Sequence, residues 1–520
     1  MSEPKKKLTM RIGLVVIFCM SVFALMAQDM KMSKGSMMKK SATSNMRKLP
    51  IDTIVMTHHS VTIGGQPIKY TAESGTQPVW NEDGMPIASL FYTYYTRDGI
   101  QDRSSRPIVV SFNGGPGSAS VWMHLAYTGP RILKIDDEGY PVQPYGVKEN
   151  PHSILDVADI VYVNPVNTGY SRIIDKEIDA KKMFFGVNQD VKYLAEWITT
   201  FMTRHNRWSS PKYLIGESYG TTRVSGLALE LQNRQWMYLN GVILVSPTEI
   251  GIERDGPVMA ANRLPYFTAA AWYQKALAPE LQAKDLMEVL EEAEQFTIDD
   301  LLPAMVRGAW LDQDARDQIT TKMSYYSGLS EEALTENNLD VSTRYFWKEL
   351  LRDEGYTIGR LDSRYLGIDK MDSGSSPDYS AELTSWLHSF TPAINFYLQE
   401  HLEFRTDIKY NMFGPVRPWD RTNNNAGENL RQAMAQNPYL NVMIQSGYYD
   451  GATTYFNAKY TMWQLDPSGK MKDRLSFKGY RSGHMMYLRA EDLKTANEDI
   501  REMIINTMPG KGVSAKYKNE

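Results

Sequence analysis

Short apolar runs alternate with amphipathic stretches through the first half of the chain. Residues 108–112 and 213–215 are fully apolar or nearly so, which is typical of strands buried on both faces of a sheet. Residues 188–205 instead carry apolar side chains at helical spacing, which predicts an amphipathic helix. Strands that alternate with helices in this way predict the α/β class, with a mainly parallel central sheet covered by helices on both faces.

The pattern changes after residue 250. Residues 284–310 and 341–355 are amphipathic and helical in spacing, with no buried strand between them, and strand character returns near residue 439. This predicts a sheet core interrupted by a mainly helical cap insertion. The expected bounds are 51–250 for the first part of the core, 251–410 for the insertion, 411–510 for the second part of the core and 511–520 for a tail.

The amino-terminal residues 1–27 differ from the rest of the chain. Lys5, Lys6 and Lys7 precede an apolar run over 12–27 that ends in the small residue Ala27, which is typical of a secretory signal peptide. The alternative is an uncleaved membrane anchor, although the run is shorter than the roughly 20 residues that a spanning helix needs.

Residues 28–50 are rich in Met, Lys and Ser without a period, which predicts a flexible linker. We therefore expect an exported protein, located in a bacterial periplasm or outside the cell.

Charge and cysteine content exclude several classes of function. The net charge of −4, with both signs interspersed, does not suggest a nucleic-acid partner. Cys19 is the only cysteine and lies within the signal segment, so disulfides, a thiol nucleophile and cysteine–metal ligation are excluded from the mature chain. The bulky Phe18 before it does not fit a lipoprotein signal. His58 and His59 are neighbours in a strand and point to opposite faces, so we expect no metal there. No cofactor motif is present in the sequence, so we expect no cofactor.

Residues 216–220, Gly-Glu-Ser-Tyr-Gly, match the pattern G-x-S-x-G. A predicted strand precedes them and a predicted helix follows, which is the context of a nucleophile elbow: a sharp turn that lifts a serine hydroxyl above the sheet. The alternative is a structural serine. The context favours Ser218 as a nucleophile.

A nucleophilic serine needs a base and an orienting acid, which in sheet hydrolases follow in the order Ser, Asp, His. Three histidines follow Ser218: His388 and His401 lie in helical sequence, whereas His484 lies in a glycine-containing loop after a strand. Asp450 lies at the end of another apolar strand. An ordinary loop histidine and a turn-forming aspartate are the alternatives. Order and context together predict a Ser218–Asp450–His484 triad.

The reaction of such a serine builds an oxyanion, which needs preorganised hydrogen-bond donors. The backbone N–H of Tyr219 follows the nucleophile, and the loop over 113–117, Asn-Gly-Gly-Pro-Gly, exposes the N–H of Gly115 after an earlier strand. A phosphate-binding loop is the alternative, but the ending G-K-[ST] is missing. We therefore expect Gly115 and Tyr219 to form the oxyanion hole.

These motifs together resemble the serine carboxypeptidase family. The sequences "NGGPGS", "VYVNPVNTGYS", "GESYG", "SGYYD" and "SGHM" occur in that family's order between about residues 105 and 490. The resemblance implies an α/β-hydrolase fold and the release of C-terminal residues from peptides. It also implies that Glu217, Asn113 and Gly114 bind the substrate's free C-terminal carboxylate.

Two positions depart from the family's pattern. A loop cysteine of the family is Ser118 here, and its second glutamate is Tyr127, two residues before a Gly-Pro pair. In the family the paired carboxyl groups share a proton, which favours acidic conditions. A tyrosine hydroxyl donates without such a proton. Our hypothesis is that Tyr127 partly replaces that glutamate, so that activity is less confined to acidic pH.

The sequence therefore predicts an exported serine-type carboxypeptidase acting on peptides with a free C-terminus through an acyl-enzyme. The alternatives on the same fold are an esterase, a proline-type aminopeptidase and an acyltransferase, because fold alone does not decide the activity. A non-catalytic binding protein on a hydrolase scaffold is a further alternative, which the complete set of triad residues disfavours. Side-chain preference, physiological substrate and oligomeric state have no readable motif.

Overall fold

The computed structural model describes residues 49–508, 510 and 512. The predicted signal peptide 1–27, the linker up to residue 48 and nearly all of the tail 511–520 lie outside the described residues, so these assignments stay predictions. The described residues from Pro50 onward belong to one compact unit.

In the described part of the chain, ten strands form one sheet in the order β1-β2-β3-β7-β4-β9-β10-β13-β14, with β8 paired to β3. The strands are β1 (Thr53–Ile63), β2 (Gln66–Trp80), β3 (Pro86–Arg97), β4 (Ile108–Phe112), β7 (Asp159–Val163), β8 (Arg172–Ile173), β9 (Lys212–Glu217), β10 (Gly241–Val245), β13 (Asn441–Gly447) and β14 (Leu475–Tyr480). Two short pairs lie apart from this sheet: β5 (Arg131–Leu133) with β6 (Val147–Glu149), and β11 (Thr357–Ile358) with β12 (Leu366–Gly367).

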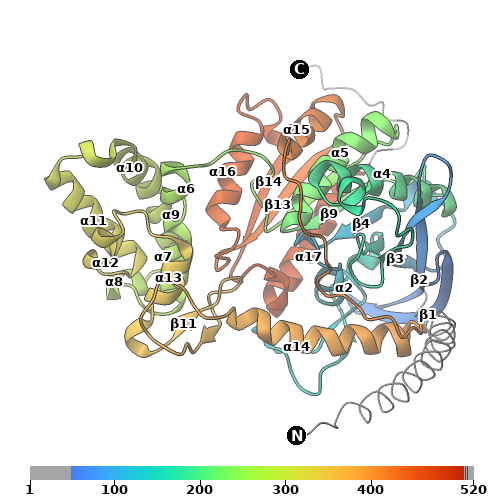
Figure 1. Cartoon of the computed structure of the whole chain (residues 1–520), viewed down its shortest axis with the longest axis horizontal. Helices are drawn as coiled ribbons and strands as arrows, with labels where there is room; N and C mark the ends of the chain where they lie inside the picture. The colour runs from blue at the N-terminus through green and yellow to red at the C-terminus, as the bar shows by residue number, and fades with distance from the viewer. Residues whose placement is uncertain (1–48, 509, 511, 513–520) are drawn as a thin grey trace, which may run out of the picture. The chain divides into compact units, whose positions relative to one another are not determined.

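Along the strand order, the sheet is antiparallel from β1 through β3 to β7 and parallel from β7 to β14. Parallel neighbours need crossover connections, and helices supply them here. The helices around the sheet are α2 (Val121–Ala126), α3 (Ala180–Phe184), α4 (Val187–Arg204), α5 (Tyr219–Arg234), α15 (Ala426–Gln436), α16 (Tyr455–Leu465) and α17 (Ala490–Thr507) (Figure 1). The predicted α/β class with a mostly parallel sheet is confirmed.

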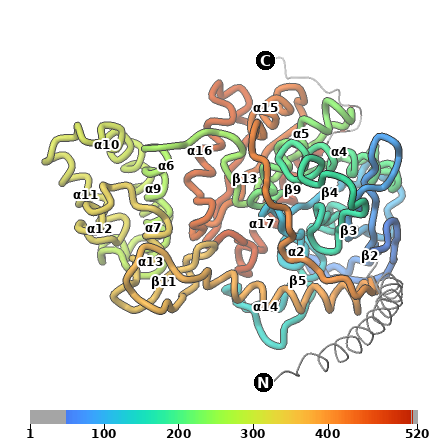
Figure 2. Tube along the Cα trace, viewed as in Figure 1, coloured from blue at the N-terminus to red at the C-terminus, as the bar shows by residue number. Residues whose placement is uncertain are grey.

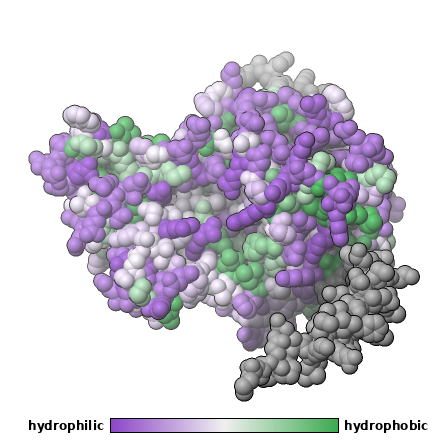
Figure 3. All heavy atoms as spheres, viewed as in Figure 1, coloured by the Kyte–Doolittle hydropathy of each residue, from purple (hydrophilic) through white to green (hydrophobic). Residues whose placement is uncertain are grey.

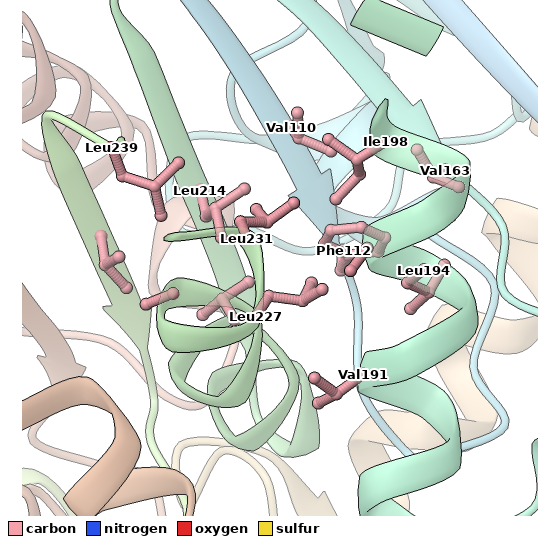
Figure 4. Close-up of a cluster of buried hydrophobic side chains, with 14 of the residues drawn as sticks. Val110, Phe112, Val163, Val191, Leu194, Ile198, Leu214, Leu227, Leu231 and Leu239 are labelled. Atoms are coloured by element: carbon pink, nitrogen blue, oxygen red, sulfur yellow. The ribbon is translucent and has the colours of Figure 1, made fainter. Parts of the chain in front are cut away.

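Side-chain alternation along the strands places a helical layer on each face of the sheet. On one face, Phe112 and Leu214 pack in the same buried cluster as residues of α4 and α5 (Figure 4). On the other face, the hydroxyl of Tyr213 donates to the carbonyl of Ile504 in α17, which also packs on β10, β13 and β14. The parallel strands are therefore buried on both faces, as their unbroken apolar runs predict.

Helices dominate the chain between β10 and α15 (Figures 1 and 2). They are α6 (Pro257–Ala261), α7 (Leu264–Tyr273), α8 (Pro279–Gln282), α9 (Leu286–Phe296), α10 (Leu302–Arg307), α11 (Gln313–Ser327), α12 (Glu331–Glu336), α13 (Thr343–Glu349) and α14 (Ala381–Phe396). Most of them share a separate hydrophobic core around Phe267 and Phe346. A second cluster joins Leu286 and Leu290 to Tyr448 and Phe456 of the sheet region. The helical insertion is thus observed, while its exact bounds 251–410 stay a prediction.

The face of the molecule seen in Figure 3 is mainly polar. In Figure 3 most atoms on the visible face belong to hydrophilic residues, with hydrophobic residues in small separate groups. Within the residues that the structure describes, no helix combines the length and the apolar composition needed to cross a bilayer.

Candidate active site

Ser218 stands at the turn between β9 and α5. Its backbone has φ of 58°, a left-handed conformation that is strained for a residue with a side chain. The turn needs both glycines: a Cβ at Gly216 would collide with the carbonyl of Gly220, and a Cβ at Gly220 would lie 2.9 Å from the carbonyl oxygen of Phe112. The G-x-S-x-G pattern therefore forms the sharp strand–turn–helix connection of a nucleophile elbow.

Asp450 and His484 meet beside this turn although they lie on different loops. The Nδ1 of His484 is 2.7 Å from Oδ2 of Asp450, and both side chains are buried. Asp450 Oδ1 accepts from the N–H groups of Ala452 and Thr453 at 2.8 and 3.1 Å, which orients the carboxylate. The hydroxyl of Thr453 donates to Asp450 Oδ2 at 2.6 Å. An acid held in this way fixes the imidazole orientation and leaves Nε2 for a reacting group.

The environment of His484 changes its proton affinity. Burial lowers the pKa of His484, but the charge of Asp450 and its hydrogen bond outweigh burial, so that the pKa is raised above the usual value of 6.5. A histidine with a raised pKa accepts a proton more readily, as a general base does, and holds it as an imidazolium beside the carboxylate.

Ser218 and His484 line one cavity of about 820 Å³. Gly114, Gly115 and Glu217 line the same cavity. The larger side chains in its wall are mainly aromatic, aliphatic or basic: Trp122, Arg360, Leu361, Leu383, Trp386, Phe413, Val416, Arg417, Trp419, Arg421 and Met485. The structure thus brings the predicted nucleophile and base together in a cleft that can hold part of a peptide.

The two predicted oxyanion donors lie at this cleft as well. Gly115 has φ of 99° and belongs to the loop after β4, and Tyr219 is the first residue of α5. Among the described residues, neither backbone N–H donates to a protein acceptor. A Cβ at Gly114 would lie 2.5 Å from the N of Tyr219, so only glycine lets the two segments approach this closely. Two free N–H groups beside a serine suit a developing oxyanion.

A buried arginine, which the sequence analysis missed, fixes the loop that carries Gly115. The guanidinium of Arg223 donates to the carbonyl oxygens of Asn113 and Pro116 at 2.5 and 3.2 Å. Its Nε also donates to Asp190 at 2.7 Å, and both charged side chains are fully buried. Arg223 therefore ties the glycine loop to the helix that follows the nucleophile. The sequence did carry one sign of this role: Arg223 is a charged residue on the apolar face of a predicted helix, five residues after Ser218.

Glu217 is buried next to the nucleophile, and each carboxyl oxygen has one donor. The amide of Asn113 donates to Oε1 at 2.9 Å, and the hydroxyl of Tyr487 donates to Oε2 in a short hydrogen bond. Burial raises the pKa of Glu217 to about 7, although His484 and the hydrogen bonds from Tyr487 and Asn113 oppose the shift. Below that pH the group is a neutral carboxylic acid, which can donate a hydrogen bond to an anion.

Of the predicted carboxylate-binding residues, Gly114 and Glu217 line the cavity but Asn113 does not. Asn113 is fully buried, and its side-chain oxygen accepts from the N–H of Met123 at 3.0 Å. Its amide group is used on Glu217. In this structure Asn113 therefore orients Glu217 from behind.

The hypothesis that Tyr127 donates to the carboxylate site is wrong. Tyr127 is fully buried, and its hydroxyl donates to Gln445 Oε1 at 2.6 Å, away from Glu217. Its ring stacks on the ring of Tyr487 with centroids 4.6 Å apart. Tyr487, three residues after His484, is the phenol that reaches Glu217. The sequence pattern pointed to Tyr127, but the direction of a side chain depends on tertiary packing, which the pattern does not contain.

The described residues include no group of three or more His, Cys, Asp or Glu side chains arranged to hold a metal ion.

Comparisons with known proteins bear on the family and the fold. The sequence model of the family described as "Serine carboxypeptidase" matches residues 65–479. Among curated proteins, the chain is 26% identical over 205 residues to "Serine carboxypeptidase-like 16" of Arabidopsis thaliana, covering 38% of this chain and 45% of that protein. It is 28% identical over 174 residues to human "Retinoid-inducible serine carboxypeptidase", covering 32% of this chain and 34% of that protein. The match thus spans less than half the length of these relatives.

A solved structure with the same fold is that of Kex1(delta)p, a prohormone-processing carboxypeptidase from Saccharomyces cerevisiae. It superposes with a TM-score of 0.50 at 14% identity, covering 84% of this chain and 91% of that chain. The similarity confirms the predicted α/β-hydrolase fold.

Proposed function

The chain belongs to the serine carboxypeptidase family, and from this premise we propose that it is a serine-type carboxypeptidase that removes C-terminal residues from peptides through an acyl-enzyme. The observation that carries the proposal is Glu217, a buried acid in the wall of the cleft directly beside Ser218. An esterase or amidase has no need of such a group at this place, whereas an enzyme that selects a free C-terminus does.

In the proposed reaction, Ser218 attacks the last peptide carbonyl while His484 Nε2 takes the serine proton. The Asp450 hydrogen bond to Nδ1 holds the ring and stabilises the imidazolium. The N–H groups of Gly115 and Tyr219 receive the negative oxygen. His484 then returns the proton to the leaving amino group, and water, activated by the same histidine, releases the acyl chain from Ser218.

Recognition of the C-terminus falls to Glu217 and Gly114. With a pKa of about 7, Glu217 is neutral in acidic and near-neutral solution and can donate to the substrate's carboxylate. The hydroxyl of Tyr487 donates a short hydrogen bond to Glu217, so we assign Tyr487 the role of holding Glu217 in place. Because Tyr487 does not line the cavity, we regard it as a positioning residue.

Export of the protein to a bacterial periplasm or the cell exterior is proposed on the amino-terminal pattern alone, since those residues lie outside the described part.

The test compares three substrates that share one acyl group: a blocked dipeptide with a free C-terminus, its C-terminal amide, and an ester. We expect preferential cleavage of the free acid, and a loss of at least about 10⁴-fold in kcat in Ser218→Ala. The control is the circular dichroism spectrum and unfolding midpoint of the variant, which should match the parent. Cleavage of the ester alone, or activity that persists in Ser218→Ala, would refute the proposed function.

A further inference from the structure

A second, smaller cavity opens beside Ser218. Its volume is about 300 Å³, and it shares Gly115 and Ser218 with the larger cavity described above. Most of its remaining wall is polar or charged, including Thr222, Thr248, Glu249, Arg254 and Asn424. Such a wall is unsuited to an apolar side chain, because the polar groups would lose their hydration without a partner.

Two arginines, Arg360 and Arg421, line both cavities and therefore stand next to the nucleophile. Arg360 belongs to the loop between β11 and β12, and Arg421 to the segment before α15. Within the described part of the chain, neither guanidinium has a carboxylate within ion-pair distance. Both residues are exposed. They present two uncompensated positive charges to whatever binds beside Ser218.

The remaining charged groups of the small cavity largely offset one another. Arg254 lies 3.7 Å from Glu249 and also donates to Thr461 at 3.1 Å. The cavity therefore keeps an excess of positive charge from Arg360 and Arg421, which complements an anion.

The position of the small cavity relative to the triad decides which part of a substrate it receives. Glu217 and His484 line the larger cavity but not the small one. In the proposed reaction His484 protonates the leaving amino acid and Glu217 binds its carboxylate, so the larger cavity holds the leaving residue. The small cavity reaches Ser218 without Glu217 or His484 in its wall, so we assign it to the residue that supplies the scissile carbonyl.

We propose that this small cavity is an anionic subsite in which Arg360 and Arg421 bind the carboxylate side chain of an aspartate or glutamate next to the C-terminal residue of the peptide. The inference rests on the proposed carboxypeptidase activity and adds its substrate class: peptides with an acidic penultimate residue. Guanidinium groups suit this role because each presents several N–H donors that match the two oxygens of a carboxylate.

The first experiment measures kcat/KM for blocked dipeptides that end in phenylalanine and carry glutamate, glutamine or lysine at the penultimate position. We expect the glutamate peptide to exceed the glutamine peptide by about tenfold, the effect of two partly exposed ion pairs, and the lysine peptide to be the slowest. Since exposed charges are screened, the glutamate-to-glutamine ratio should fall as NaCl is raised to about 0.5 M.

The second experiment measures the same ratio in variants. Arg360→Gln and Arg421→Gln should each lower it about threefold, and the double variant should bring it close to one. Arg421→Lys should keep part of the preference, because it retains the charge but not the paired donors. The matched control is Arg417→Gln, an exposed arginine that lines only the larger cavity and should leave the ratio nearly unchanged. A ratio does not depend on how much of a variant folds.

The outcomes separate this inference from the proposed function. Equal rates for the glutamate and glutamine peptides, or a preference that survives in the double variant, would overturn the acidic subsite while leaving the carboxypeptidase activity intact. If all free-acid peptides resist cleavage while the ester is hydrolysed, the proposed function fails, and the subsite assignment fails with it. A preference for glutamate that persists when the C-terminus is amidated would support the subsite independently of Glu217.

Discussion

The charged groups on the two proposed sides of Ser218 are held in opposite ways. On the leaving side, Glu217 is only 3% exposed, and each of its oxygens is held by a donor, Asn113 or Tyr487. On the acyl side, Arg360 and Arg421 are exposed and have no carboxylate partner among the described residues. A buried acid responds to pH because desolvation shifts its pKa, whereas exposed guanidinium groups stay charged and respond to salt.

The same contrast separates the arginines themselves. Arg223 is completely buried and binds Asp190 and two carbonyl oxygens of the glycine loop, so it stabilises the fold and the loop that carries Gly115. The guanidinium groups of Arg360 and Arg421 have no carboxylate partner among the described residues. One arginine therefore belongs to the scaffold and two are available to a ligand, a difference that follows from burial.

The largest expected effect is on kcat, because the catalytic step is common to all substrates whichever side of Ser218 binds them. Asp450→Asn should lower kcat by about 10⁴-fold, because an asparagine amide no longer stabilises the imidazolium and can hold His484 in the wrong tautomer. The loss should be similar for free-acid, amide and ester substrates, as measured by steady-state kinetics. A loss confined to free-acid peptides would instead assign Asp450 to binding of the substrate's C-terminus, and would contradict a role in the chemistry common to all three substrates.

Next in size is the effect of Arg223 on stability. Arg223→Met leaves Asp190 as an unpaired buried charge and should lower the free energy of unfolding by about 3–5 kcal/mol in denaturant titrations. The paired change Arg223→Met with Asp190→Leu should recover much of that loss. Arg421→Gln, the exposed counterpart, should change the stability by less than about 0.5 kcal/mol. Equal losses in Arg223→Met and Arg421→Gln would contradict the division between scaffold and ligand arginines.

The pH dependence of KM tests only the proposed role of Glu217 in binding the leaving residue. Glu217 has a pKa of about 7, so it is protonated below and ionised above that pH, where it repels a substrate carboxylate. The KM for free-acid peptides should therefore rise about 50-fold between pH 7 and pH 9, since the protonated fraction of Glu217 falls from about one half to about one hundredth. Amide substrates should show no such rise. In Glu217→Gln, whose side chain is neutral throughout, the KM for free-acid peptides should be nearly flat over this range.

The smallest effect concerns the phenol behind Glu217. The hydrogen bond from Tyr487 lowers the pKa of Glu217, so Tyr487→Phe should raise that pKa and move the rise in KM to higher pH. At pH 9 the variant should bind free-acid peptides about three- to tenfold more tightly than the parent, the size of one hydrogen bond. Tyr127→Phe is the matched control, because its hydroxyl binds Gln445 and should leave the pH profile in place. A shift in Tyr127→Phe but not in Tyr487→Phe would restore the original hypothesis for Tyr127.

Local sequence patterns predicted the strands and helices of the core well, but they predicted little about the residues that line the cavities beside Ser218. The apolar runs around β4 and β9 and the helix spacing of α4 were enough for the α/β class, since each signal lies within one element. Residues Ser218, Asp450 and His484 could be chosen because chain order and loop context restrict the candidates. The structure brings Asp450 and His484 within 2.7 Å although they are 34 residues apart.

The sequence by itself determined the class of fold, the elbow and the candidate triad, because strand periodicity and turn chemistry depend on neighbouring residues. Only the tertiary structure decided that Tyr487 and not Tyr127 binds Glu217, since two tyrosines whose rings stack differ only in where their hydroxyls point. It also decided that Arg360 and Arg421, from segments far apart in the chain, meet beside Ser218. The reason is physical: contacts between distant segments depend on how whole layers pack, and no local pattern carries that information.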